Sequence, residues 1–185
     1  MSRRRIPSDR NRDTGVVDEV ARIIEQWSVE RAELDVSPMG VFGRIAKVHR
    51  AQIEASEAAH RELGISQADF DVLATLRRSG APCRLTPSEL TAQMMISSGG
   101  VTQRVDRLAR VGLVRREPHP RDRRSTPVTL TEAGRKLIDQ ALPLHLAAEE
   151  ALLTGLSPSE RDQLAQLLSR LLTGLPTPGG ATPTE

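Results

Sequence analysis

The feature that most restricts the fold of this chain is the stretch 86–134, in which two short helices precede two short β-prone runs. Thr86-Pro87-Ser88-Glu89 has the spacing of a capping box with proline in the first helical position, which predicts a helix over 87–93. The segment MMISSGG then turns the chain. A second helix follows to Gly112, and its apolar positions are Val101, Val105 and Leu108. A short helix, a tight turn and a second amphipathic helix predict a helix-turn-helix.

The second helix of this motif presents small and hydrogen-bonding side chains. We expect Ser97 or Ser98 to cap it, and Thr102, Gln103 and Arg107 to follow on its polar side. Side chains of this kind near the start of a helix can approach base edges and phosphates closely. These five residues are therefore the candidate DNA contacts of the helix.

The two β-prone runs, 113–117 and 127–130, enclose the basic segment PHPRDRRST and predict a hairpin, or wing. The arginines at its tip are Arg121, Arg123 and Arg124. Arginines beside a helix-turn-helix suit phosphate or minor-groove contacts, although a solvated charged loop is the alternative. Asp122 would repel phosphate, so we expect it to hold Arg124 or the loop backbone and thereby orient an arginine.

The rest of the chain is predicted to be helical, so the fold class is mainly α with one small β-hairpin wing. Apolar residues recur at helical spacing over 16–33, 39–62, 66–78, 131 to about 155, and 156–172. The expected helix starts are Ser37, Ser66, Thr131 and Ser157. We expect a disordered basic arm at 1–13, N-terminal helices at 14–63, the DNA-binding lobe at 64–134, C-terminal helices at 135–173, and a disordered tail at 174–185.

Composition excludes several classes of protein. The one cysteine, Cys83, allows no disulfide framework and favours a reducing compartment. The N-terminus has no apolar segment, and no run of about 18 apolar residues occurs, so we expect a cytoplasmic protein.

The sequence also lacks the patterns of metal sites and enzymes. The four histidines are His49, His60, His119 and His145. They are far apart in the sequence and have no carboxylate or cysteine at zinc-ligand spacing, so a metal sensor is disfavoured. We find no glycine-rich phosphate loop, nucleophile elbow or paired carboxylates, and we expect neither enzymatic activity nor a cofactor.

The segment 97–134 resembles the signature of MarR-family transcriptional regulators. Its matching elements are the recognition helix, an LxxxGLV run from Leu108, DxR at Asp122–Arg124, and LTxxG at Leu130–Gly134. A similar layout extends over about 38–173. The resemblance implies a winged-helix homodimer built from N- and C-terminal helices. It also implies a palindromic operator and release by small ligands, often phenolic or other aromatic anions.

A narrower resemblance is to the PecS-like, urate-responsive branch of that family, which carries an extra N-terminal helix with a tryptophan. By this resemblance the urate site would consist of Trp27, Asp71, Arg78 and Arg104. Asp71 and Arg78 are two turns apart on one predicted helix, roughly 10 Å along its axis. An aromatic anion could then lie between a stacking indole and arginine donors.

Each of these residues also has an ordinary alternative role. Trp27 could be a core residue, Asp71 the ion-pair partner of a neighbouring arginine, and Arg104 a phosphate contact. We therefore predict a homodimeric DNA-binding repressor that a small aromatic anion such as urate releases. The alternatives are a winged-helix protein-interaction module, or a regulator that responds to phenolic compounds or to thiol oxidation.

Overall fold

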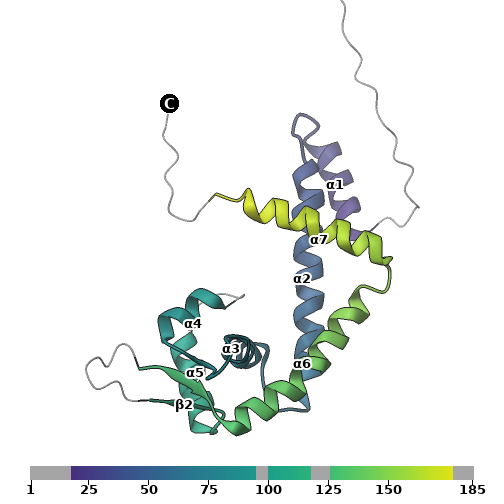
Figure 1. The fold of residues 1–185 in the computed structure, drawn as a ribbon. Helices are drawn as coiled ribbons and strands as arrows, with labels where there is room; N and C mark the ends of the chain where they lie inside the picture. Colours follow the sequence, from purple (N-terminus) through teal and green to yellow (C-terminus); the bar gives the residue numbers. More distant parts are fainter. Residues whose placement is uncertain (1–17, 95–99, 118–125, 177–185) are drawn as a thin grey trace, which may run out of the picture. The chain divides into compact units, whose positions relative to one another are not determined.

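The computed structural model describes residues 18–94, 100–117 and 126–176 (Figure 1). The helices are α1 (Glu19–Glu30), α2 (Ser37–Arg61), α3 (Gln67–Arg78), α4 (Pro87–Gln93), α5 (Val101–Arg110), α6 (Glu132–Leu152) and α7 (Pro158–Thr173). The strands are β1 (Arg84–Leu85), β2 (Val114–Arg116) and β3 (Val128–Leu130). The chain divides inside α2, between Arg50 and Ala51, into two compact units. None of the described helices is long and apolar enough to cross a membrane.

In the first unit, α1 lies against the first half of α2. Asp18 caps α1, and its carboxylate also accepts a 2.8 Å hydrogen bond from Nε of Arg44 on α2. These hydrogen bonds, led by the one from the helix backbone, lower the pKa of Asp18. Val20 is the buried residue of α1, and a Cβ added to Gly43 would come within 2.9 Å of its Cγ1. Glycine at this position therefore lets the two helices approach closely.

The start of α2 differs from the prediction. Ser37 was expected to precede the helix as its cap, but it is the first helical residue. Its backbone N–H donates to Oδ1 of Asp35 at 3.0 Å, so a side chain two residues earlier satisfies this donor.

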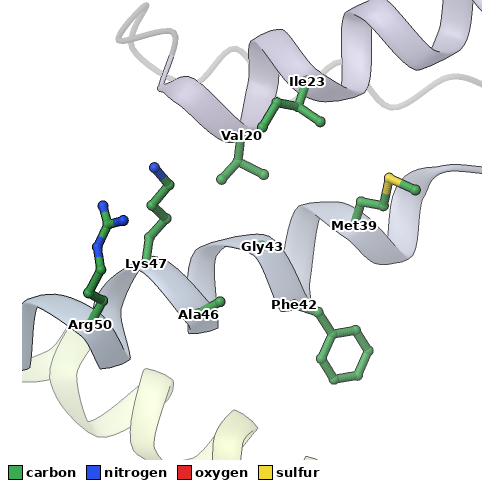
Figure 2. Close-up of a pocket in the computed structure, with 8 residues that line it drawn as sticks. All are labelled: Val20, Ile23, Met39, Phe42, Gly43, Ala46, Lys47 and Arg50. Atoms are coloured by element: carbon green, nitrogen blue, oxygen red, sulfur yellow. The ribbon is translucent and has the colours of Figure 1, made fainter.

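An apolar pocket of about 440 Å³ lies between α1 and α2 in this unit, as Figure 2 shows. Its lining residues are Val20, Ile23, Met39, Phe42, Gly43, Ala46, Lys47 and Arg50. Lys47 at one end is ion-paired with Glu19 of α1. Phe42 and Val48 on α2 remain 55% and 65% exposed, so this unit by itself leaves apolar surface uncovered.

The second unit is built around α3, which packs against α4, α5, α6 and β3. Figure 1 shows α3 nearly end-on among these elements. Val72, Leu73 and Leu76 of α3 are fully buried. The expected start at Ser66 is confirmed, and Ser66 and Asp69 form a capping box in which each side chain accepts the backbone N–H of the other residue.

The sheet has three antiparallel strands in the order β1-β3-β2, whereas the sequence predicted only a hairpin. Arg84 and Leu85 of β1 pair with Thr129 and Val128 of β3. A strand of two residues has no periodicity for sequence analysis to detect. Its pairing depends on the free edge of β3, which only the folded lobe brings next to it.

The start of α5 is also different from the prediction. The helix begins at Val101, and its N-cap is Gly100 in the left-handed conformation with φ 81°, without a side-chain cap. The predicted cap by Ser97 or Ser98 is therefore wrong, and both serines lie outside the described residues. Glycine fits this position because it adopts a positive φ without steric cost.

The turn after α5 meets the start of α6 at Gly134. Thr131 caps α6 and its hydroxyl also donates to the carbonyl of Gly112 at 2.7 Å. A Cβ added to Gly134 would overlap the backbone carbonyl oxygen of Leu113. The two motifs LxxxGLV and LTxxG are therefore in direct contact, and the second requires a residue without a side chain.

We expect Gly134→Ala to lower the free energy of unfolding by about 1–3 kcal/mol, because the backbone must shift to relieve the overlap. Urea denaturation measures this loss. Gly155→Ala is the matched control, since a Cβ there meets nothing within 4 Å. Equal stabilities of the two variants would contradict the packing described here.

A buried stack of three rings joins α2, α3 and α6. Ring centroids of His60 and Phe70 are 4.4 Å apart, those of Phe70 and His145 4.4 Å, and those of the two histidines 5.4 Å. His60 is fully buried and neither of its ring nitrogens has a hydrogen-bond partner among the described residues. Burial, and next the charge of His145, lower the pKa of His60. His60 and His145 are far apart in the sequence, but the fold stacks their rings.

This stack predicts acid sensitivity of the fold. The unfolded chain takes up a proton on His60 near its ordinary pKa of 6.5, whereas the folded chain resists protonation until lower pH. Stability should therefore fall as the pH drops below about 6.5, by up to about 1.4 kcal/mol per pH unit for this proton. Urea unfolding across this pH range measures the slope.

His60→Phe keeps a ring in the stack and should reduce that slope. His49→Gln, at an exposed position of α2, should leave it unchanged. An unaltered slope in His60→Phe would show that another group causes the acid sensitivity.

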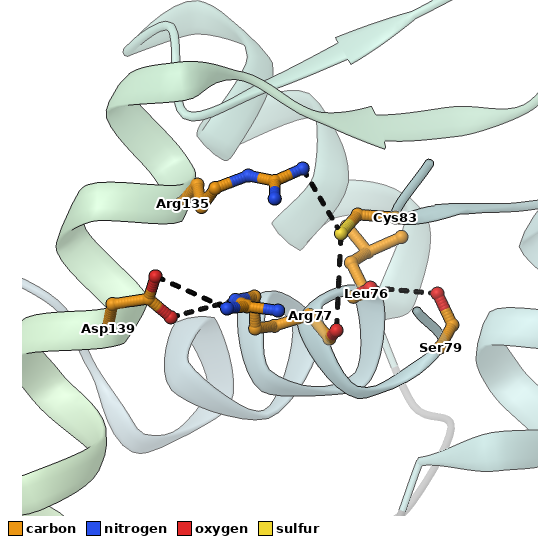
Figure 3. A network of polar contacts seen from close by, with 6 residues as sticks. All are labelled: Leu76, Arg77, Ser79, Cys83, Arg135 and Asp139. Atoms are coloured by element: carbon orange, nitrogen blue, oxygen red, sulfur yellow. Dashed lines mark hydrogen bonds and ion pairs between the residues drawn. The ribbon is translucent and has the colours of Figure 1, made fainter. Parts of the chain in front are cut away.

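A polar network fastens the end of α3 to α6 and to the segment before β1 (Figure 3). Arg77 donates from Nε to Asp139 of α6 at 2.8 Å. Arg135 of α6 lies 3.5 Å from Sγ of Cys83, which is 1% exposed. Cys83 is thus a buried residue of the lobe.

The last helix, α7, has its predicted start but buries no residue. Ser157 and Glu160 form a capping box, and Arg161 donates to the carboxylate of Glu150 at 2.6 Å. Its exposed leucines are Leu164, Leu167, Leu168 and Leu172. An exposed row of leucines of this kind is typical of an interaction surface.

Candidate nucleic-acid interface and effector site

The polar face of α5 is the candidate reading surface. Val101, Val105 and Leu108 are buried in the core of the lobe, and Thr102 and Gln103 are exposed. The buried residues recur every three or four positions, so they fix one side of the helix inward and leave the predicted contacts outward. The helix therefore has the form that major-groove readout requires.

Two ion pairs hold α5 to its neighbours. Arg107 donates from one terminal nitrogen to Oδ2 of Asp69 on α3 at 2.5 Å. Asp106 accepts from Arg116 on β2 at 2.7 Å. The sequence predicted Arg107 as a DNA contact but did not predict either ion pair, because partners on different elements leave no local pattern.

The base of the wing carries a second charged cluster. Glu117 follows β2 and lies 2.8 Å from Arg115 and 3.5 Å from Arg84 of β1. The hydrogen bond from Arg115 is the main cause that lowers the pKa of Glu117, with Arg84 adding to it. These pairs join β1 and β2 across the sheet. Ser97, Ser98, Arg121, Asp122, Arg123 and Arg124 lie outside the described residues.

Three of the four predicted effector residues lie in the second unit. Asp71 on α3 accepts a 3.1 Å hydrogen bond from Gln67. Burial raises the pKa of Asp71, and the hydrogen bond from Gln67 and the nearby charges of Arg104 and His145 partly oppose this. Asp71 and Arg104 are thus within electrostatic reach, which connects α3 with the recognition helix α5.

The other two predicted effector residues have different surroundings. Arg78 ends α3 and donates to the carbonyl of Gln93 at the end of α4, and to Thr75 at 3.4 Å. Trp27 belongs to α1 in the first unit and is 43% exposed. Trp27 is therefore not a buried residue of its own unit, which was the alternative to a ligand contact.

Metal ligation finds no support in the described part of the chain. There, no group of three or more histidine, cysteine, aspartate or glutamate side chains could hold a metal ion. Nε2 of His145 lies 3.2 Å from the carboxylate of Glu149, but two side chains are too few to form such a group.

Known proteins share both the sequence and the fold. A model of the MarR family matches residues 63–125. The HTH-type transcriptional regulator PecS of Dickeya dadantii (strain 3937) is 39% identical over 153 residues, which cover 83% of this chain and 92% of PecS. The chain belongs to the MarR family. Its relatives are DNA-binding transcriptional regulators, so the predicted family, winged-helix fold and non-enzymatic function are confirmed.

Solved MarR structures relate the fold to DNA. A cysteine-to-serine mutant of MarR from E. coli, complexed with operator DNA, has a TM-score of 0.65 and 27% identity. The match covers 75% of this chain and 99% of that structure. The MarR family regulator Sco3205 from Streptomyces coelicolor, at 22% identity and TM-score 0.68, shows the same fold over 80% of this chain and 94% of its own. This protein is accordingly a DNA-binding regulator of the MarR type.

If Thr102 and Gln103 read bases, their alanine variants should lose discrimination more than total binding. We expect Gln103→Ala or Thr102→Ala to cost about 1–3 kcal/mol of preference for operator over unrelated DNA. Competition binding at fixed salt measures this ratio. Gln140→Ala on the exposed face of α6 is the control and should not change it. A ratio unaffected by both Thr102→Ala and Gln103→Ala would remove α5 from base readout.

Proposed function

We propose that this MarR-family regulator is a homodimeric repressor that binds a pseudo-palindromic operator through α5 and the wing. The observation that carries the proposal is the exposed polar face of α5 in a fold shared with a MarR protein that is complexed with operator DNA. A relative named transcriptional repressor MprA, from Escherichia coli (strain K12), is 33% identical over 112 residues. They cover 60% of this chain and 63% of MprA.

Uncovered apolar surface supports the dimer. In the first unit Phe42 and Val48 are more than half exposed, and in the second Leu167 and Leu172 are 59% and 67% exposed. A second copy of the chain would cover such faces, as apolar surface of this extent marks an interface. Two recognition helices related by a two-fold axis would meet half-sites about one helical turn apart.

A small aromatic anion such as urate is the proposed effector. The electrostatic link between Asp71 and Arg104 supports this, because Arg104 stands on the recognition helix. An anion bound by arginines near Asp71 would compete with the carboxylate for Arg104. Without the attraction between Asp71 and Arg104, the orientation of α5 would change and the protein would release DNA. Urate binding by Trp27, Asp71, Arg78 and Arg104 is part of the proposal.

Thiol oxidation is a weaker alternative for the effector. Cys83 is buried to 1% exposure and lies against Arg135 and the end of α3. Reactive cysteines are exposed to solvent and lie in electropositive surroundings. Cys83 does not have the solvent exposure.

Titration of urate against the protein–DNA complex tests the proposal, with Trp27 fluorescence as a second reporter. We expect urate to release DNA and to quench Trp27, because an aromatic ligand beside the indole changes its emission. Asp71→Asn and Arg104→Gln should weaken the response. Asp162→Asn, exposed on α7, should retain it.

The outcomes separate the alternatives. If salicylate releases the DNA and urate does not, a phenolic acid takes the place of urate as the proposed effector, and the proposal of a repressor stands. Absence of any shift of operator DNA at low salt would contradict DNA binding itself and favour a protein-interaction module.

A further inference from the structure

We propose that Arg107 is a positioning residue, whose ion pair with buried Asp69 sets the orientation of the recognition helix α5. The sequence alone predicts Arg107 as a DNA contact. The inference deepens the proposed function and rests on it, because it concerns how the reading face is aligned on operator DNA.

Asp69 is enclosed on every side. It is 1% exposed, and its Oδ2 accepts from the backbone N–H of Ser66 at 3.0 Å, the hydroxyl of Ser66 at 2.6 Å, and Arg107 at 2.5 Å. Its Oδ1 is buried and has no hydrogen-bond partner among the described residues. Arg107 is therefore the cation that compensates this carboxylate.

The charge of Asp69 restricts what Arg107 can do. If Arg107 left for a DNA phosphate, a carboxylate would remain buried without a counter-charge, which is strongly unfavourable. A phosphate contact at the exposed surface offers much less, since water screens it. The side chain of Arg107 thus stays with α3 when DNA binds.

The geometry of α5 explains what the pair would set. Val101, Val105 and Leu108 turn one side of α5 inward, which sets the rotation of the helix only coarsely because apolar contacts are not directional in themselves. The charged hydrogen bond from Arg107 to Asp69 is directional and fixes the rotation of α5 about its axis. Gln103 lies one turn before Arg107, so any rotation of the helix moves this candidate base contact directly.

The experiment compares Asp69→Asn, Arg107→Gln and the double variant with the wild-type protein. The probes are an operator duplex that the wild-type protein selects from a random library, and a scrambled duplex of the same composition. Affinities are measured over a salt series, below the unfolding transition of every variant. Arg77→Gln is the matched control, because it removes an arginine that pairs α3 with α6 instead of α5.

Both single variants should lose about tenfold in operator affinity, and the double variant should lose no more than either. Affinity for the scrambled duplex and the salt slope should stay near wild type, because no phosphate contact is removed. Arg77→Gln should leave the ratio of operator to scrambled affinity unchanged.

Two results would overturn the inference. A salt slope reduced by about 0.9 in Arg107→Gln, with Asp69→Asn normal, identifies a phosphate contact. Equal losses of affinity for the operator and the scrambled duplex show that the Asp69–Arg107 pair supports only the stability of the fold. If Asp69→Asn does not fold, the ratio of operator to scrambled affinity and the salt slope are measured on Arg107→Gln and Arg107→Lys, and these two variants test the inference. Failure of the wild-type protein to select any duplex would instead contradict the proposed function.

Discussion

The packing of α3 against α4, α5, α6 and β3 positions everything else in the DNA-binding lobe. Val72, Leu73 and Leu76 are fully buried there, and burial of such side chains contributes about 1.5–3 kcal/mol each. The same helix carries Asp69 and Asp71 on its polar positions. Because both carboxylates stand on the central helix, their surroundings are determined by the core. A shift of α3 would therefore move Asp69, which is paired with the recognition helix, together with Asp71.

Electrostatic contacts add direction to this apolar core. The pairs Asp69–Arg107 and Asp106–Arg116 attach α5 to α3 and to β2 at successive positions. The effector candidate Asp71 differs from Asp69, since burial raises its pKa and the hydrogen bond from Gln67 is its main compensation. One carboxylate of α3 is thus a fixed structural charge. The other, Asp71, is a partly buried carboxyl whose pKa is raised by burial.

The molecule also contains polar burial that costs stability. His60 is fully buried without a hydrogen-bond partner among the described residues, stacked between α2, α3 and α6. Apolar surface is left exposed on α2 and α7, which isolated helices in water do not tolerate well. Both features concern the helices outside the helix-turn-helix. The DNA-binding lobe has a well-buried apolar core, whereas α2 and α7 leave large apolar side chains exposed.

The sequence by itself determined the local structure: the amphipathic helices, the helix starts at Ser66, Thr86 and Ser157, and the wing strands. These signals lie within four residues of one another, so they are readable without a fold. It also determined the family, through motifs that follow one another along the chain. Only the tertiary structure decided that Gly100 starts α5, that β1 joins the sheet, and that His60 stacks with His145. It likewise decided the partner of Arg107, which is 38 residues away at Asp69. Contacts over such separations depend on which helices pack together, and the identity of a partner on another helix leaves no periodic trace in the sequence.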